Sequence, residues 1–221
     1  MNIFDIIGPV MIGPSSSHTA GAVRIGKIAG ALLKGKPVKA TIYLYGSFAK
    51  TYKGHGTDKA LIAGILGMNP DDPRIRNSLE LATEEGLEYH FIKDEMDGAH
   101  PNTTRIELVD SQGNEAITQG ASIGGGNVVI QKINDMKVEI TGQYTTLIVL
   151  HNDAPGTIAA VTNYVAAQGM NIGNFRLSRD QKGGTAVMVI EMDALCTDEV
   201  NDGIMKLANV ISSTLIPPIS I

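Results

Sequence analysis

Cysteine is nearly absent from this chain of 221 residues, in which Cys196 is the only one. A single cysteine forms no internal disulfide, and it cannot supply the about three thiolates that an iron–sulfur cluster with one open iron requires. Tryptophan is absent, phenylalanine occurs four times, and no group of lysines and arginines is interleaved with aromatic residues. Because nucleic-acid binding depends on such basic and aromatic patches, we expect no nucleic acid as a partner.

The sequence also lacks a long apolar run. Its first eleven residues, MNIFDIIGPVM, are apolar but include Asp5, are interrupted by Gly8-Pro9 and carry none of the basic residues that begin a signal peptide. We therefore expect neither a secretion signal nor a membrane anchor, and a cytoplasmic protein. A net charge of -5 and 43% hydrophobic residues are typical of a globular chain with one large or two modest cores.

The first part of the chain mixes helical and strand patterns. Apolar residues recur at the spacing of one helix face and predict a helix over about 18–34, and the alternation over 38–45 predicts a strand. The glycine-rich stretch TYKGHGTD follows this strand. Thr57 or Asp58 has the character of a helix N-cap, and Asp72 followed by proline begins another helix. Strand patterns follow at LEYHFIK, TTRIELVD, EAITQGASI, VVIQKIN and KVEI.

Around TGQY the pattern restarts, and the remaining segments follow the order βαββαβ. This order is that of the ferredoxin-like unit, a four-stranded antiparallel sheet with two helices on one face. The inner face of its first helix is predicted to hold Ile158, Val161, Val165 and Ala166. We therefore predict an α+β domain over residues 1–141, followed by a ferredoxin-like domain over 145–221.

The second domain resembles the ACT domain, a module that usually senses amino acids, through the turn HNDAPG and the later GMNI. The resemblance implies a regulatory site at Asn152, Pro155 and Gly156. There Asn152 and the helix N-terminus would meet a carboxylate, and Gly156 would allow the backbone to approach the ligand. It also implies a homodimer formed through this domain. A module that only dimerises and binds no ligand is the alternative.

Four motifs, GPSSSHTAGAVRIG, GSFAKTYKGHGTDKAL, HPNTTRI and SIGGG, occur in the same order as in another family. Together they resemble the β chain of the bacterial iron–sulfur-dependent L-serine dehydratase. The resemblance implies an L-serine ammonia-lyase that forms pyruvate and ammonia. It also implies a partner α chain that holds the [4Fe-4S] cluster, which this chain does not ligate, and a β chain that is inactive alone.

The first domain is also similar to the allosteric-substrate-binding domain of some D-3-phosphoglycerate dehydrogenases. The same fold can serve as a regulatory site without any chemistry. The alternative function is therefore a purely regulatory, amino-acid-binding subunit without catalytic groups.

Serine dehydration removes the Cα proton and the β-hydroxyl, so the enzyme needs a base and a grip on the substrate. His55, between two glycines, is the predicted base, because histidine titrates near neutral pH. His18, at the start of the first predicted helix, is the second catalytic candidate. Substrate-binding candidates offer hydroxyls, amides, a positive charge or backbone N–H groups at a helix start; they are Ser15, Ser16, Ser17, Thr19, Lys53, Asn102 and Thr103. The glycines at 124–126 complete the predicted pocket wall.

Each of these motifs also has a purely structural interpretation. Three serines ahead of a helix can act only as an N-cap, and GHGTD can be a tight turn followed by a cap. His90 and His100 are interpreted as structural. No metal site is predicted at His18 and His55, because no carboxylate or cysteine stands at a recognisable ligand spacing beside either.

Overall fold

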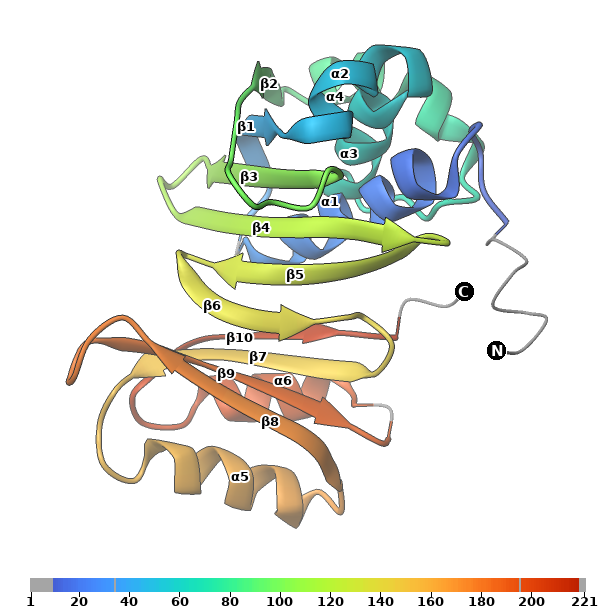
Figure 1. Ribbon diagram of the computed structural model, residues 1–221. Helices are drawn as coiled ribbons and strands as arrows, with labels where there is room; N and C mark the ends of the chain where they lie inside the picture. Colours follow the sequence, from blue (N-terminus) through green and yellow to red (C-terminus); the bar gives the residue numbers. More distant parts are fainter. Residues whose placement is uncertain (1–9, 34, 195, 219–221) are drawn as a thin grey trace. The chain divides into compact units, whose positions relative to one another are not determined.

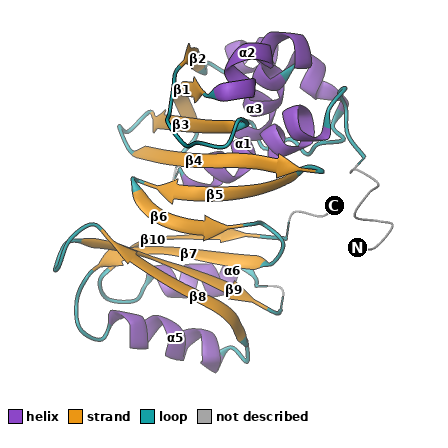
Figure 2. Ribbon diagram, in the orientation of Figure 1, coloured by secondary structure: helices purple, strands orange, loops and turns teal. Residues whose placement is uncertain are grey.

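The computed structural model describes residues 10–33, 35–194 and 196–218 (Figure 1). The chain divides into two compact units between Asp135 and Met136. Each unit pairs a β-sheet with helices (Figure 2). The architecture is α+β, with the predicted ferredoxin-like arrangement in the second unit.

The strands of the first unit follow the order β2-β1-β3-β4-β5. Strands β1 and β2 are parallel, and the other neighbours pair antiparallel. In β1 the alternate residues Ala40, Ile42 and Leu44 are buried, which confirms the period of two seen in the sequence. The strands are β1 (Pro37–Leu44), β2 (Glu88–Lys93), β3 (Thr103–Asp110), β4 (Glu115–Gly124) and β5 (Asn127–Ile133).

Two helices of the first unit cross at glycines. Helix α1 packs on β3, β4 and β5, and α3 packs on α1. A Cβ atom added to Gly64 of α3 would lie 2.1 Å from the carbonyl oxygen of Val23, and one added to Gly26 of α1 would lie 2.3 Å from that of Leu61. The two backbones therefore touch. The helices are η2 (Ser16–Gly21), α1 (Ala22–Leu32), α2 (Gly46–His55), α3 (Thr57–Ile65), η3 (Pro73–Asn77) and α4 (Ser78–Glu84).

Leaving TYKGHGTD outside the predicted helices is wrong, because most of this stretch belongs to α2. Helix α2 ends at Gly56, whose left-handed φ of 70° is a conformation that glycine adopts without steric cost. The same residue is the N-cap of α3, so the prediction of Thr57 or Asp58 as N-cap is also wrong. Gly54 lies inside α2, where nothing is within 4 Å of its missing Cβ.

The helix predicted over 18–34 begins earlier and changes type along its length. Ser16–Gly21 form a π-helix, and the α-helix α1 then ends at Leu32. Short π-helical segments occur frequently at functional sites. The Asp72 cap is confirmed, since its side chain accepts a hydrogen bond from the backbone N–H of Arg74 at the start of the 3-10 helix η3.

The ACT-like part of the second unit has the strand order β10-β7-β9-β8, with antiparallel neighbours. This is the order of the ferredoxin-like fold. Helices α5 and α6 bury one face of this sheet, and the core contains Leu147, Val149, Val161, Val165, Met188, Ile190, Met192, Val200 and Ile204. The elements of the whole second unit are β6 (Met136–Ile140), β7 (Thr145–Asn152), α5 (Thr157–Ala167), β8 (Ile172–Arg179), β9 (Thr185–Met192), α6 (Asp198–Met205) and β10 (Val210–Ile216), of which β6 precedes the ACT-like part.

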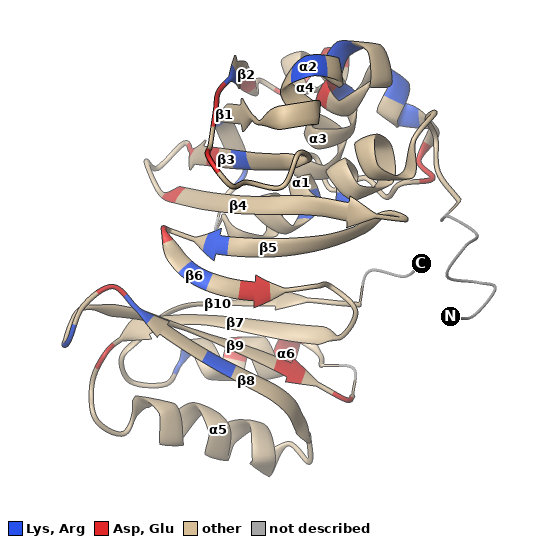
Figure 3. Cartoon of the chain, in the orientation of Figure 1, with Lys and Arg blue, Asp and Glu red and all other residues tan. Residues whose placement is uncertain are grey.

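The inner face of α5 differs in part from the prediction. Val161 and Val165 are buried as expected, whereas Ile158 is 40% exposed and Ala166 is exposed. Thr157 is buried in their place. The buried face of α5 is therefore narrower than the sequence pattern indicates. Helix α5 also carries no charged residue (Figure 3). Among the helices of the described residues, none is both long and apolar enough to cross a membrane.

Candidate active site

His18 lies in the π-helix η2, and both nitrogens of its ring meet a serine hydroxyl. The Nδ1 atom is 3.3 Å from Ser15 Oγ, and the Nε2 atom is 3.2 Å from Ser47 Oγ. Ser15 is the N-cap of η2, and its Oγ also accepts a hydrogen bond from the backbone N–H of His18. The imidazole is only 9% exposed, so the two hydroxyls determine how its ring is oriented.

Helix α2 carries the other residues that surround His18. Ser47 stands near its start and His55 is its last residue. The rings of His18 and His55 pack edge to face, with centroids 4.7 Å apart and planes at 84°. Phe48 packs in a similar way, with its centroid 5.2 Å from that of His18. One side of α2 therefore supplies a hydroxyl, an apolar ring and a second imidazole to His18.

The turn HPNT fixes the start of α2. Gly46 has φ of 55°, and a Cβ atom there would lie 2.7 Å from the carbonyl oxygen of Pro101, so the two backbones approach closely. That carbonyl accepts the N–H of Ser47, and the carbonyl of Thr103 accepts the N–H of Tyr45. These bonds join the end of β1 to the start of β3 and place Ser47 against His18.

Burial lowers the pKa of His18, and the nearby His55 lowers it further. A neutral imidazole is therefore favoured at position 18 at neutral pH. His55, in contrast, is exposed at the protein surface. The two histidines differ in environment: one is held by hydroxyls away from solvent, and the other opens to solvent.

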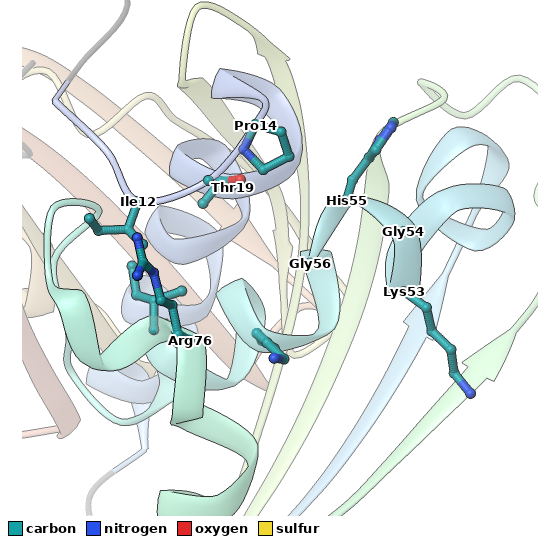
Figure 4. A pocket seen from close by; sticks show the side chains of 11 residues that line it. Ile12, Pro14, Thr19, Lys53, Gly54, His55, Gly56 and Arg76 are labelled. Atoms are coloured by element: carbon teal, nitrogen blue, oxygen red, sulfur yellow. The ribbon is translucent and has the colours of Figure 1, made fainter.

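A pocket of about 320 Å³ lies beside His55 (Figure 4). Thr19 and Pro14 line it from the N-terminal segment, and His55 and Gly56 line it from the junction of α2 and α3. The side chain of Lys53 extends away from Thr19 in Figure 4. The full lining is Ile12, Gly13, Pro14, Thr19, Lys53, Gly54, His55, Gly56, Lys59, Ile75 and Arg76.

The structure brings some of the predicted site residues together and places others elsewhere. His18, Ser15 and His55 meet, and Thr19 and Lys53 line the pocket. The candidates that do not line the pocket are Ser15, His18, Ser16, Ser17, Asn102 and Thr103, together with the glycines at 124–126.

Asn102 and Thr103 lie beneath the site, next to β4. The amide Nδ2 of Asn102 donates to the carbonyl oxygen of Ser122, and Gly21 of η2 packs directly against the Ser122 side chain. The glycine turn after β4 is tied to α1, since the buried Arg24 donates through Nη1 to the carbonyl oxygen of Gly126. These residues support η2 from below.

In the second unit, the predicted regulatory residue Asn152 is the last residue of β7, and Pro155 and Gly156 follow in the loop before α5. Gly156 has φ of 86° and is the N-cap of α5. The neighbouring Asp153 accepts hydrogen bonds through Oδ2 from the N–H of Gly183, at 3.0 Å, and from Nη1 of Arg179, at 2.9 Å. These bonds, led by that of Gly183, lower the pKa of Asp153. A carboxylate thus ties the loop to the β8–β9 turn.

Comparison with known proteins places this chain in a family. A family model described as the serine dehydratase beta chain matches residues 2–85. The probable L-serine dehydratase beta chain of Bacillus subtilis is 43% identical over 97% of both chains, and the L-serine dehydratase beta chain of Peptoniphilus asaccharolyticus is 37% identical over 91% of both. This chain belongs to the L-serine dehydratase beta chain family. The resemblance to this family that the sequence indicated is therefore confirmed.

Two further matches were found for this chain. An AHAS small subunit-like ACT domain model matches residues 147–212, which confirms the ACT resemblance. The D-3-phosphoglycerate dehydrogenase of Archaeoglobus fulgidus is 27% identical over 88% of this chain and 37% of its own length.

The residues of this chain do not fit an iron–sulfur cluster. Cys196 is its single cysteine, and burial raises the pKa of that thiol, with a further contribution from Asp198. A cluster ligand is a thiolate, so the raised pKa acts against ligation. Among the described residues, no three histidine, cysteine, aspartate or glutamate side chains gather as a metal site.

Three residues of the beta chain site were not found from the sequence: Ser47, Lys59 and Arg76. Ser47 contacts His18 because residues 46–55 are helical, and no helix was predicted there. Lys59 and Arg76 line the pocket from α3 and η3. In α3 the sequence signal is the charge itself, since Lys59 is the one basic residue of TDKALIAGI, and all other residues of this helix are buried.

Proposed function

We propose that this chain is the β subunit of an L-serine ammonia-lyase, which converts L-serine to pyruvate and ammonia. In this proposal an α chain holds the [4Fe-4S] cluster, and the β chain alone is inactive. Membership of the L-serine dehydratase beta chain family supports the reaction. The observation that carries the assignment of roles is the contact between a buried histidine and an exposed histidine at the edge of a pocket.

His55 is the proposed base that takes the Cα proton of serine. It lines the pocket and is exposed, so a substrate in the pocket can reach its ring. His18 stays neutral because its pKa is lowered, and therefore a proton that arrives on His55 meets no positive charge from His18. Loss of the Cα proton and the β-hydroxyl leaves 2-aminoacrylate, which tautomerises and hydrolyses to pyruvate and ammonia.

The remaining candidates complete this proposal. His18 is a catalytic group through its contact with His55, and Ser15 holds its ring. The proposed substrate-binding residues are Ser15, Ser16, Ser17, Thr19, Lys53, Asn102 and Thr103. In the ACT domain, Asn152, Pro155 and Gly156 are proposed to bind a regulatory amino acid, and the uncharged outer side of α5 supports dimerisation through this domain.

The decisive experiment compares His55→Asn with a matched surface variant in the complete enzyme. The chain is co-expressed with its α chain, iron and sulfide are reconstituted without oxygen, and pyruvate formation is measured. The control is His90→Asn, because His90 is also exposed but is bound to Glu88 on β2. Removal of a general base typically costs about 100-fold to 10,000-fold in rate.

We expect His55→Asn to lose at least about 100-fold in kcat and His90→Asn to keep the wild-type rate. If the His55→Asn enzyme keeps the wild-type kcat, His55 is not the base. If, in addition, His55→Asn and His18→Asn change only the response to added amino acids, the chain is the regulatory subunit of the alternative hypothesis.

A further inference from the structure

The pocket beside His55 has only one sign of charge. Its charged lining residues are Lys53, Lys59 and Arg76, of which Lys53 extends its side chain away from Thr19, and no aspartate or glutamate lines it. They come from three different elements, α2, α3 and η3. A cavity lined by one sign of charge concentrates ligands of the opposite sign. The chemistry of the lining therefore selects an anion.

Arg76 remains available for such a ligand, whereas its neighbour Arg74 does not. Asp72 caps η3 and binds the guanidinium of Arg74, with Nη2 and Oδ2 2.6 Å apart. Within the described part of the chain, no ion pair is found for Arg76. Buried Ile75 anchors the turn between the two arginines. The turn therefore holds one arginine internally and directs the other to the pocket.

The backbone of Lys59 is fixed by a hydrogen bond, whereas its ammonium group is exposed. The carbonyl oxygen of Lys59 accepts a hydrogen bond from Ser78 Oγ at 2.7 Å. The adjacent Asp58 does not line the pocket; burial raises its pKa, and the nearby positive charges of Lys59 and Lys53 offset part of that rise. The ammonium of Lys59 has no ion-pair partner among the residues that the structure describes.

An unsatisfied buried hydroxyl provides an independent sign of a ligand. Thr19 lines the pocket and is only 2% exposed, and no described residue forms a hydrogen bond with its Oγ1. Because most buried polar groups form a hydrogen bond, the unpaired Oγ1 of Thr19 points to a partner supplied by a ligand. On the opposite wall, Gly54 and Gly56 have nothing within 4 Å of a missing Cβ, which leaves space above their backbone.

We infer that Lys59 and Arg76 bind the α-carboxylate of the amino-acid substrate in this pocket, with Thr19 Oγ1 as a further hydrogen-bond donor. This inference rests on the proposed function, since it places the carboxylate in the pocket that His55 also lines. Arginine and lysine form charge-assisted hydrogen bonds with carboxylates. The volume of about 320 Å³ is within the range of small-molecule sites.

The first test measures ligand binding by the full-length chain in calorimetric titrations. The ligands are L-serine, L-serinamide, which lacks the carboxylate, and inorganic phosphate. We expect L-serine to bind, L-serinamide not to bind, and Arg76→Gln and Lys59→Gln each to raise the Kd for L-serine about tenfold. Arg74→Gln is the matched control and keeps the wild-type Kd, because Arg74 is already paired with Asp72.

Three results would overturn the inference: no binding of L-serine to the chain, equal binding of L-serinamide, or no effect of either pocket variant. Phosphate that binds through the same two residues at least tenfold more tightly than L-serine would also overturn it, because the pocket would then be a site for a free inorganic anion.

The second test uses the enzyme assembled with its α chain. We expect Arg76→Gln to raise the KM for L-serine about tenfold while kcat changes by less than about twofold; an unchanged KM contradicts the inference. If the assembled protein forms no pyruvate and the chain still binds L-serine through Arg76, the proposed function fails and the carboxylate site stands.

Discussion

Replacement of Gly64 by alanine tests the crossing of α1 and α3. The new Cβ would lie 2.1 Å from the carbonyl oxygen of Val23 and 2.7 Å from the backbone nitrogen of Lys27. Both neighbours are backbone atoms of a helix, so they cannot move aside as a side chain does. An ordinary contact of 3.4 Å requires the helices to separate by about 1.3 Å at this point.

The expected change in stability follows from two opposing contributions. Alanine is the better helix former by about 1 kcal/mol. Overpacking in a core costs about 1–3 kcal/mol, and here the upper end applies because separation also loosens the buried contacts around Ile25, Ile28, Leu61 and Ile62. We therefore expect Gly64→Ala to lower the free energy of unfolding by about 2 kcal/mol.

Urea unfolding of the full chain, followed by circular dichroism at the helical band, measures this loss as a lower midpoint. The matched control is Gly54→Ala, which also adds a methyl group to a helix but meets no atom within 4 Å. It should leave stability unchanged or raise it by up to about 1 kcal/mol. A Gly64→Ala chain as stable as the Gly54→Ala chain would refute the close approach of the two helix backbones.

Three further outcomes follow from the structure. Ser47→Ala leaves Nε2 of the buried His18 without its hydroxyl and should lower the free energy of unfolding by about 1 kcal/mol, whereas Ser47→Thr should restore it, both read from urea midpoints. Because His18 has a lower pKa folded than its unfolded value of 6.5, the unfolded state binds more protons below that pH. Stability should therefore fall as pH drops from 7 to 5.5, by at most about 1.4 kcal/mol per pH unit, and a His18→Gln chain should show less of this fall. Asp153→Ala should speed hydrogen exchange at the amide of Gly183, as measured by NMR, and an unchanged rate would contradict the bond between them.

The second unit was predictable because its signals are local. Alternating strand residues, turn glycines and a helical stripe recur in the order βαββαβ, and each pattern is contained in a few consecutive residues. The error at Ile158 arose because a helical stripe shows which residues share a side but not how wide the buried part of that side is.

Helix α2 could not be predicted in the same way, because its support comes from distant residues. The glycines at 54 and 56 gave the segment no helical pattern, and GHGTD was also interpreted as a tight turn followed by a cap. The helix is fixed by hydrogen bonds from its start to Pro101 and Thr103, about fifty residues away in the sequence. His18 and His55 were predicted as members of one site from their motifs. Ser47 became apparent only once the helix between Gly46 and His55 was known.

The length of α2 fixes the relative positions of two side chains of the site. Ser47 near one end of the helix and His55 at the other both contact the imidazole ring of His18. The number of residues between them therefore sets the direction of the His55 ring. Each residue of an α-helix turns the chain by about 100°. A relative that gained or lost one residue within α2 would keep its serine bond and turn its second histidine away, so insertions should be tolerated in the surrounding loops and selected against here.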